Sequence, residues 1–445
     1  MGIPNNIQDI ILKEIRPARL SSYHVATRAF PAFRFVDVYN AVEAISSEAH
    51  ECAVVKSMHG EDLSSIIHTP GVQWSRREYT RSTLAFWPAG PTSEISLPID
   101  QFWLFRPPEE DHVAVVRVRY IEYQDKVMLE AATVRSRTGE ILLDRVGTKS
   151  LQDSIYRNQT IELAYQAGTR DQYGEVEQME RVRVLFKQMD PVEDKDVILD
   201  DTIRRMLLRN VVDLHERREL LKAHHVPIRR GVLLYGPPGT GKTYTCRYLC
   251  TKLPTATKII ATGSAMMLVS KIFQLARLFQ PAVIFLEDID LVFTHRDINY
   301  AGAMLGELLD QMDGLRSFED IGFVMTTNAI DRLESALKDR PGRISQCIFL
   351  GPPNPALRRR FLQHALQPYD SGHLEIDRLV SVSEGATQAF VKEWVHRAVQ
   401  IATTRLADLE DALQLQHHDF TEALDEMRQF GEGTAGTIVG FRSGR

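Results

Sequence analysis

The sequence predicts an α/β fold for the central part of the chain, in which helices flank a parallel β-sheet. Two observations support this prediction. From Arg230 onward, short apolar segments alternate with segments of helical pattern, which is typical of strand–helix–strand units. The segment GPPGTGKT at 236–243 follows an apolar strand pattern and precedes a helical one. The clearest predicted strands are GVLLY, ATKIIATG, AVIFLEDID and IGFVMTTN, with CIFLG as a fifth.

The rest of the chain predicts further parts around this sheet. An acidic connector, QMDPVEDKDVILDD at 188–201, separates the first part from a helix-rich lead-in. After Pro353 the pattern is almost wholly helical, and the last residues are rich in Gly. The predicted parts are an N-terminal α+β domain for a substrate or partner (1–188), a linker with lead-in helices (189–229), an α/β subdomain (230–353), an all-α lid (354–430) and a Gly-rich tail (431–445).

The N-terminal part combines helical and strand patterns. Apolar residues repeat at helical spacing over 36–48, which predicts a helix. From His112 to Val146 the segments HVAVVRVRY, KVMLEAATVRS and ILLDRV predict three strands of an antiparallel sheet, with a turn at TGE. Aromatic residues and Pro crowd 84–91 and 99–108. We favour burial of these residues in the core over a recognition surface.

Composition limits the classes of function. The net charge is −6 and no long run of Lys or Arg occurs, so nucleic acid is an unlikely partner, though charge alone does not exclude it. Four cysteines suit neither a disulfide scaffold nor a four-ligand zinc cluster, and they favour a reducing compartment. Neither an uninterrupted apolar stretch of about 18 residues nor a signal-peptide layout is visible. The sequence therefore predicts a cytoplasmic protein without membrane insertion.

The segment GPPGTGKT has the features of a phosphate-binding loop. Its glycines let the backbone approach closely and turn N–H groups toward phosphate oxygens, while the following helix N-terminus adds positive potential. We expect Lys242 to reach the β- and γ-phosphates of ATP, and the Thr243 hydroxyl to bind Mg²⁺. The predicted nucleotide-binding residues of this segment are Gly236, Pro237, Pro238, Gly239, Thr240, Gly241, Lys242, Thr243 and Tyr244.

A second motif follows about 40 residues later, in VIFLEDID at 283–290. Carboxylates at the C-terminal edge of a parallel sheet lie beside such a loop. Strand register assigns Glu287 to the magnesium position and Asp288 to the position that orients and deprotonates the attacking water. This order reverses the Asp–Glu order usual in phosphate-loop ATPases. Slower hydrolysis, a water bridging Asp288 to the nucleophile, and loss of catalysis are the open alternatives.

With these two motifs in place, the segment from about 191 to 430 resembles the AAA family of ring-forming, hexameric ATPases. MTTN at 325–328 resembles the polar sensor strand of the family, which implies that Asn328 contacts the γ-phosphate or the attacking water. DRLESALKDRPGR at 331–343 resembles the second region of homology. The resemblance implies that Arg340 and Arg343 are arginine fingers that act in the neighbouring subunit's nucleotide site.

The lid segment SEGATQAFVKEWVHRAVQIA at 383–402 resembles the Gly-Ala helix start of the family, which implies that Gly385 and Ala386 lie near the base and ribose. Within the family, the order of the acids, the segment HVPIRRGVLLYGPPGTGKT and the lid most resemble the mitochondrial AAA translocase of the folded Rieske iron–sulfur protein. Two departures limit that comparison. No transmembrane helix is visible, and GSAMMLVSKIF replaces the family's aromatic, apolar, Gly loop. Met266 and Met267 would be the contacts if this loop met a substrate, but we favour their burial in the sheet–helix core. Tyr300 in the later segment INYAGAM is another candidate contact.

Three functional hypotheses remain at this point. The first is a Mg²⁺-dependent ATPase in a homo-oligomeric, hexameric ring, which remodels, disassembles or moves a macromolecular client, most simply a protein recruited by 1–188. The second is a nucleotide-gated switch or scaffold that hydrolyses ATP slowly because its acids are reversed. The third is a nucleic-acid-dependent ATPase. Its only support is scattered Arg, as at 204–209 and 357–361, and both segments read more simply as exposed helix faces.

Overall fold

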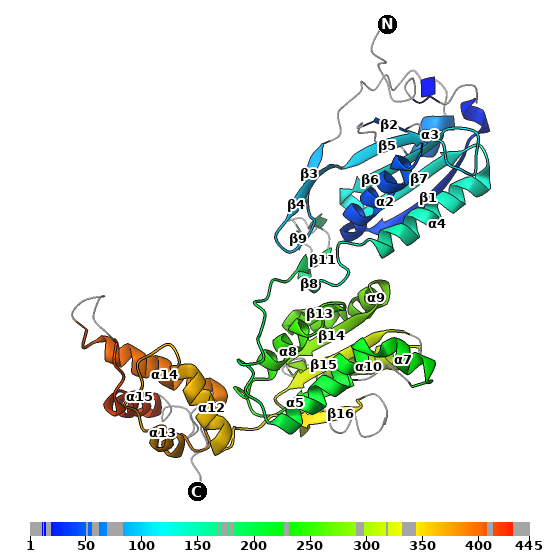
Figure 1. The fold of residues 1–445 in the computed structure, drawn as a ribbon. Helices are drawn as coiled ribbons and strands as arrows, with labels where there is room; N and C mark the ends of the chain where they lie inside the picture. The colour runs from blue at the N-terminus through cyan, green and yellow to red at the C-terminus, as the bar shows by residue number, and fades with distance from the viewer. Residues whose placement is uncertain are drawn as a thin grey trace. The chain divides into compact units, whose positions relative to one another are not determined.

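The chain divides into two compact units, Met1–Gln188 and Met189–Arg445 (Figure 1). Its structure is known here from a computed structural model. The residues that the structure describes are 11, 13–14, 19–49, 52–55, 62–68, 83–166, 169–170, 176–178, 181–226, 231–290, 298–316, 319–331, 344–406 and 413–429.

The first unit is built on a five-stranded antiparallel sheet with the strand order β1-β7-β6-β5-β2. Alternate side chains of the sheet enter two cores. Helices α2 and α4 cover the face of the sheet that carries Trp103. Helix α3 packs on the opposite face, which carries Phe102. The elements are β1 (His24–Pro31), α2 (Phe35–Ser47), β2 (Cys52–Val55), α3 (Leu63–His68), β5 (Asp100–Phe105), β6 (Ala114–Ile121), β7 (Lys126–Thr133) and α4 (Ser136–Gln152).

Smaller elements complete this unit. Three short 3₁₀ helices lie at Leu20–Ser22, Ala32–Arg34 and Glu122–Gln124. The antiparallel pairs are β3 (Leu84–Pro88) with β4 (Glu94–Pro98), β8 (Thr160–Gln166) with β11 (Arg181–Phe186), and β9 (Thr169–Arg170) with β10 (Val176–Gln178).

The predicted helix at 36–48 and the first two predicted strands after His112 are confirmed, but the third strand is wrong. ILLDRV lies inside helix α4, as does the predicted TGE turn. Leu142, Leu143 and Val146 are buried, a spacing that fits a helix packed on a sheet. Gly139 allows close packing, since a Cβ there would lie 3.1 Å from Thr133 Oγ1. The glycine therefore marks a helix–sheet contact and not a turn.

The two aromatic segments behave differently. All six residues of β5 are buried, so 99–108 contributes to the core as expected. In β3, Trp87 packs against the core, with its ring 4.5 Å from that of Phe35. Leu84 and Phe86 point outward and are 58% and 76% exposed. The core interpretation therefore holds for one side of β3 only.

The second unit contains a parallel sheet in which the strands lie in the order β13-β14-β15-β12-β16. All five strands predicted for this region are confirmed, and so is the α/β class. Helix α9 packs on β13 and β14, and α10 packs on α9. The elements are β12 (Gly231–Tyr235), α8 (Lys242–Thr251), β13 (Thr257–Thr262), a 3₁₀ helix (Gly263–Leu268), α9 (Val269–Leu278), β14 (Ala282–Glu287), α10 (Ile298–Asp313), β15 (Ile321–Thr327) and β16 (Gln346–Phe349).

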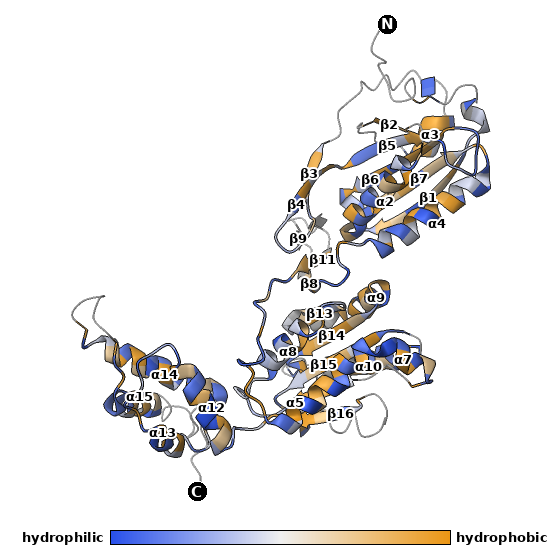
Figure 2. Cartoon of the chain, in the orientation of Figure 1, coloured by the Kyte–Doolittle hydropathy of each residue, from blue (hydrophilic) through white to orange (hydrophobic). Residues whose placement is uncertain are grey.

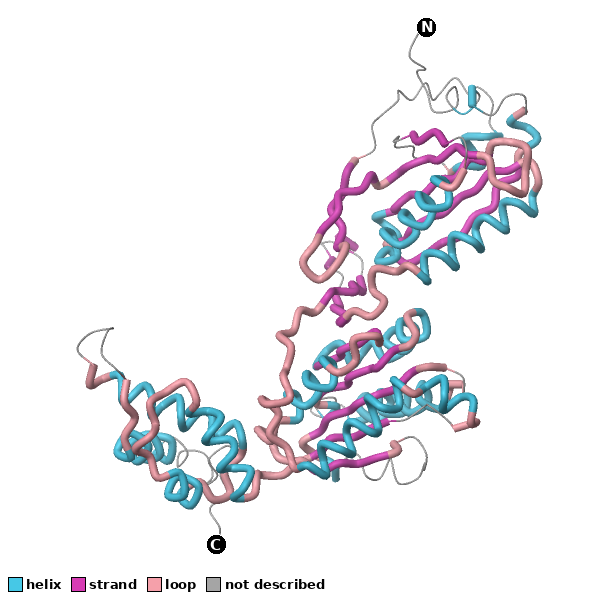
Figure 3. Tube along the Cα trace, viewed as in Figure 1, coloured by secondary structure: helices cyan, strands magenta, loops and turns pink. Residues whose placement is uncertain are grey.

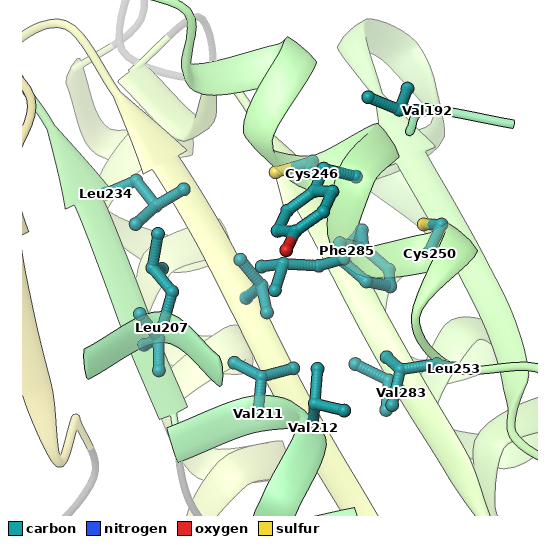
Figure 4. Packing of buried hydrophobic residues seen from close by; sticks show 14 of the residues in the cluster. Val192, Leu207, Val211, Val212, Leu234, Cys246, Cys250, Leu253, Val283 and Phe285 are labelled. Carbon is teal, nitrogen blue, oxygen red and sulfur yellow. The ribbon is translucent and has the colours of Figure 1, made fainter. Parts of the chain in front are cut away.

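The lead-in to this sheet is helical, as predicted. It comprises α5 (Asp201–Leu207), a π-helical segment (Leu208–Asp213), α6 (Leu214–Glu216) and α7 (Arg218–Ala223). Val211 and Val212 of the π-helical segment face the sheet strand that carries Phe285 (Figure 4). Cys246 and Cys250 of α8 are buried in the same core, where they act as small apolar packing residues.

A helical lid follows the sheet and is confirmed as all-α within the described ranges (Figure 3). Trp394 lies at its centre, where its indole N–H donates to the Phe420 carbonyl at 2.8 Å. Its helices are α12 (Pro355–Leu366), α13 (Ile376–Val382), α14 (Gln388–Thr403) and α15 (His417–Gln429). The predicted Gly-rich tail, 431–445, lies outside the described residues.

Apolar and polar residues alternate along the helices, whereas the parallel strands are largely apolar (Figure 2). This pattern is typical of a sheet covered by amphipathic helices. None of the helices within the described ranges has both the length and the apolar character needed to cross a lipid bilayer.

Burial of His215 makes the stability of the second unit depend on pH. His215 lies in α6, is 8% exposed, and its Nε2 lies 3.0 Å from Thr255 Oγ1. Burial lowers the pKa of His215 from its usual 6.5 to about 4. Between pH 6.5 and pH 4, His215 therefore binds a proton in the unfolded chain but not in the folded chain. The free energy of unfolding falls as the pH is lowered through this range. We expect a loss of about 2 kcal/mol in the free energy of unfolding between pH 7 and pH 5.

Urea denaturation at the two pH values measures this loss. The His215→Gln protein should lose less stability than the wild type on going from pH 7 to pH 5. The exposed residue His418 provides the matched control, because His418→Gln should keep the wild-type pH dependence. Equal pH dependence in the wild type and the His215→Gln protein would contradict the assignment.

Candidate nucleotide-binding site

The loop 236–241 joins the end of β12 to the start of α8, and its conformation requires glycine. Gly236, Gly239 and Gly241 have φ angles of 149°, 78° and 85°, which L side chains rarely adopt. A Cβ on Gly236 would lie 2.0 Å from the Leu350 carbonyl oxygen. The loop therefore passes too close to the segment after β16 for any larger residue.

Lys242 is the first residue of α8 and its ammonium group turns back over the loop. Nζ donates to the carbonyl oxygens of Gly236 and Pro237, both at 2.8 Å. Burial lowers the pKa of Lys242, and the carboxylates of Asp288 and Asp290 act in the opposite direction. A buried cation at a helix N-terminus is unfavourable unless anions lie nearby. The position therefore suits a side chain that binds a charged phosphate.

Of the two predicted acids, Asp288 faces this loop more directly. β14 ends at Glu287, which is 7% exposed, and the chain then turns sharply at Asp288. Asp288 has a φ of 51°, in the left-handed region. Its Oδ1 accepts a hydrogen bond from Asn328 Nδ2 at 3.3 Å. The structure therefore brings together Asp288 and Asn328, which follow two neighbouring strands.

A cavity of about 710 Å³ lies between the loop and the lid, within the size range of ligand sites. One end is polar and contains Lys242, Thr243, Asp288 and Asn328. Glu287 does not line it. Of the predicted loop residues, Gly236 and Pro237 do not line it either, although their carbonyl oxygens accept hydrogen bonds from Lys242 Nζ. The lining residues from the loop and α8 are Pro238, Gly239, Thr240, Gly241, Lys242, Thr243, Tyr244, Thr245 and Arg247.

Two other segments line the cavity. Sequence reasoning missed the connector, and in the lid it predicted a contact but not the residues that make it. The connector contributes the mostly apolar stretch Asp196, Val197, Ile198 and Leu199. The lid contributes aromatic and basic side chains from α12, from the residues just after it and from α14: Phe361, His364, Tyr369, Lys392 and His396. The only signal in the sequence was the apolar run VIL inside an otherwise acidic connector.

Contacts with α5, with α8 and with the residue after α8 hold the connector in place. Asp194 accepts hydrogen bonds from Tyr248 Oη at 2.7 Å, Lys252 Nζ at 2.8 Å and Arg204 at 2.6 Å. The Lys252 hydrogen bond, followed by that from Tyr248, holds the pKa of Asp194 at about 2. The backbone two residues earlier is fixed as well, because the Val192 N–H donates to Thr251 Oγ1 at 3.1 Å. These contacts fix Val192 and Asp194, and the connector residues that follow them line the cavity.

Gly385 and Ala386 lie just before α14, but their neighbours make the contacts. Ala386 is fully buried in the lid core, and Gly385 has a φ of 77°. Thr387 caps α14 through the Phe390 N–H. The Ala389 N–H donates to the Gly239 carbonyl at 3.1 Å, so the start of α14 lies directly against the loop. Gln388, Ala389 and Lys392 line the cavity in place of the predicted pair.

Several predicted residues cannot be placed. Arg340 and Arg343 lie outside the described residues. Met266 and Met267 lie in the 3₁₀ helix after β13, and Tyr300 lies in α10. The structure does not describe the side chains of these three residues. The assignments of these residues stay predictions.

Comparison with known proteins adds to this geometry. Residues 232–352 match the model of the ATPase family associated with various cellular activities (AAA). The chain is 32% identical over 211 residues to the proteasome-activating nucleotidase of Sulfurisphaera tokodaii, which covers 44% of this chain and 54% of that protein. It is 32% identical over 267 residues to the 26S protease regulatory subunit 6A of Caenorhabditis elegans, which covers 56% of this chain and 60% of that protein.

A third relative is the ATP-dependent zinc metalloprotease FtsH 2 of a Thermoanaerobacter species, 31% identical over 247 residues, or 52% of this chain and 47% of that protein. The chain thus spans between 47% and 60% of the length of these relatives. The segment matched by the family model contains the loop, both acids and Asn328.

Proposed function

We propose that the protein, whose residues 232–352 match the model of the AAA ATPase family, hydrolyses ATP with Mg²⁺ and uses the energy to remodel, disassemble or move a protein client. The observation that carries this proposal is the single cavity around which Lys242, Thr243, Asp288 and Asn328 converge. A cation, a hydroxyl, a carboxylate and an amide at one end of a cavity are the groups that phosphoryl transfer to water requires.

The phosphates and the base of the nucleotide would bind at opposite ends of the cavity. The loop N–H groups and Lys242 would hold the β- and γ-phosphates. The apolar connector residues Val197 and Ile198 would pack against the base, with Tyr369 of the lid contributing an aromatic surface. Because the connector and the lid both contact the nucleotide, its binding would restrict their positions relative to the sheet.

The donor set at the polar end suits magnesium. Thr243 and Asp288 line this end and offer a hydroxyl and a carboxylate, which are hard oxygen ligands. Glu287, which ends β14 and does not line the cavity, stays the predicted carboxylate ligand of the metal. Within the described ranges, no group of three or more His, Cys, Asp or Glu side chains is placed to hold a metal ion. Mg²⁺ commonly binds through one or two protein groups together with phosphate oxygens and water. When bound, it would neutralise charge on the phosphates while Asp288 orients the attacking water.

The wider function follows from the same domain. We propose a homo-oligomeric, hexameric ring in which Arg340 and Arg343 complete the neighbouring subunit's site. The unit Met1–Gln188 would recruit the client. The order of Glu287 and Asp288 supports a motor module of the Rieske-translocase type, without extending that protein's substrate to this chain. A cytoplasmic location stays a prediction.

The reversed acids favour a second candidate, a nucleotide-gated switch that binds ATP and hydrolyses it slowly. Asp has a shorter side chain than Glu, so its carboxylate reaches less far toward the attacking water. Steady-state phosphate release from purified protein distinguishes the two. Turnover near typical enzyme values supports the motor, and stable ATP binding with negligible phosphate release supports the switch.

Replacing Lys242 with Ala should weaken ATP binding roughly 10- to 100-fold, because a charged hydrogen bond to phosphate is worth about 1.5 to 3 kcal/mol. Titration with a fluorescent ATP analogue in the presence of Mg²⁺ measures this change. Lys271, exposed on α9 of the same unit, supplies the control, since Lys271→Ala should bind as the wild type does. Unchanged affinity in the Lys242→Ala protein, or no ATP affinity in the wild type, would contradict the proposed function.

A further inference from the structure

Two hydrogen bonds, each from a backbone N–H to a side-chain oxygen, connect the loop after β14 to the end of β15. The Asp288 N–H donates to Thr326 Oγ1 at 2.8 Å. The Asn328 N–H donates to Asp290 Oδ1 at 2.9 Å. The first bond runs from the acid loop to β15 and the second runs back from the end of β15 to the acid loop. Between them lies the side-chain contact from Asn328 Nδ2 to Asp288 Oδ1.

The first of these bonds supports an unusual backbone conformation. Asp288 has a φ of 51°, and a non-glycine residue keeps such a conformation only where the surrounding structure holds it there. Thr326 Oγ1 accepts its hydrogen bond from the N–H of this same residue. Its direction and short length fit the turn that directs the Asp288 side chain away from β14 and toward the cavity.

Thr326 is a rigid acceptor. It is fully buried on β15, and β12 pairs with it on one side through Leu234 while β14 pairs with the adjacent Met325 on the other. A β-branched side chain has few rotamers, so its hydroxyl position follows from the strand. Asp290 is also largely buried, at 9% exposed, and its Oδ1 accepts from the Asn328 N–H.

We propose that Thr326 is a positioning residue for ATP hydrolysis. It holds Asp288 in the left-handed conformation, and this conformation directs the Asp288 carboxylate toward Asn328 and the phosphate end of the cavity. Asp290 plays the corresponding part for Asn328. The inference rests on the proposed function, because it assigns Thr326 and Asp290 to the alignment of the pair that would handle the attacking water. Neither residue lines the cavity, so each acts through its neighbour.

This role differs from simple packing in what it predicts for kinetics. A hydroxyl that only satisfies a buried N–H affects folding stability. A hydroxyl that aligns the water-binding pair affects turnover at saturating ATP and leaves ATP affinity intact, because the loop and the lid still hold the nucleotide.

The test compares Thr326→Val with Thr326→Ser. Val keeps the β-branched shape and removes the acceptor, whereas Ser keeps the acceptor. We expect kcat to fall roughly 10- to 100-fold in the Thr326→Val protein, because small misplacements of catalytic groups cost about this much, with KM and the ATP dissociation constant within about twofold of wild type. The Thr326→Ser protein should retain most of the wild-type kcat.

Thr133 supplies a matched control. It is also a fully buried Thr on a strand, β7 of the other unit, and its hydroxyl donates to the Arg135 carbonyl at 2.8 Å. Thr133→Val should therefore leave kcat unchanged. Thermal melting of each variant shows whether it is folded under the assay conditions.

The outcomes separate the inference from the proposed function. An active wild type with an equally active Thr326→Val protein overturns the inference alone, as does an equal loss in the Ser and Val proteins. An inactive wild type overturns both. If the Thr326→Val protein does not fold, Asp290→Asn and Asp290→Ala test the other hydrogen bond, from the Asn328 N–H to Asp290 Oδ1. A kcat loss confined to the Ala substitution supports the inference, because Asn keeps an oxygen acceptor, and equal kcat values contradict it.

Discussion

An Asp288→Asn protein is expected to bind ATP with wild-type affinity and to hydrolyse it roughly 100- to 10,000-fold more slowly, the range by which a positioned general base accelerates reactions. Asn has the shape of Asp and keeps an oxygen that can accept from Asn328 Nδ2. It cannot take a proton from water. The binding site should therefore survive while the chemical step fails. Single-turnover phosphate release, beside a binding titration, measures both quantities.

Two comparisons sharpen this prediction. Asp425, exposed on α15, supplies the control, because Asp425→Asn should hydrolyse ATP at the wild-type rate. Glu287→Gln should instead raise the Mg²⁺ concentration needed for half-maximal turnover, if Glu287 serves the metal. Normal turnover in the Asp288→Asn protein contradicts the assignment of Asp288 as the base. A large loss of turnover in the Glu287→Gln protein at saturating Mg²⁺ assigns the base to Glu287 and makes the two roles the reverse of those predicted.

The parallel sheet could be predicted because its signals are local. Each strand is a short apolar run, and GPPGTGKT places the turn between β12 and α8. The same local reasoning failed at α4, where Gly139 in a TGE segment has the pattern of a turn. The local pattern does not reveal that α4 packs on the sheet, where Leu142, Leu143 and Val146 are buried and Gly139 lies close to Thr133 of β7.

The site could be predicted only in part, for a similar reason. Lys242, Thr243 and Asp288 belong to motifs, so their spacing identifies them. The connector residues at 196–199 line the cavity because Asp194 is bound to Tyr248, and no pattern in the sequence links positions 54 residues apart. The left-handed conformation of Asp288 likewise depends on Thr326, on a different strand. Sequence motifs thus identify the reactive side chains of this site, whereas the positions of these side chains depend on contacts between segments far apart in the sequence.

Substitution of Arg343 by Ala should lower ATP turnover roughly 1,000- to 100,000-fold while ATP binding persists, because an arginine finger stabilises charge that develops only in the transition state. At an ATP concentration that saturates the wild type but not the weakened site, Lys242→Ala should also show little turnover, for the different reason that its own loop binds the phosphates poorly. The two defects lie on opposite sides of a subunit interface if the finger acts in trans. Coexpression of the two inactive chains should therefore restore activity that neither has alone.

The extent of recovery follows from the geometry of a ring. In a head-to-tail ring of randomly mixed chains, an interface is competent when an intact loop faces an intact finger, which holds for about one quarter of interfaces at equal expression. Turnover near one quarter of the wild-type value is therefore expected from the mixture. A doubly substituted chain, Lys242→Ala with Arg343→Ala, coexpressed with Lys242→Ala offers no intact loop and should stay inactive. If electron microscopy shows mixed rings and turnover still does not recover, the finger acts within its own chain or not at all, and the coupling of hydrolysis to assembly fails with it.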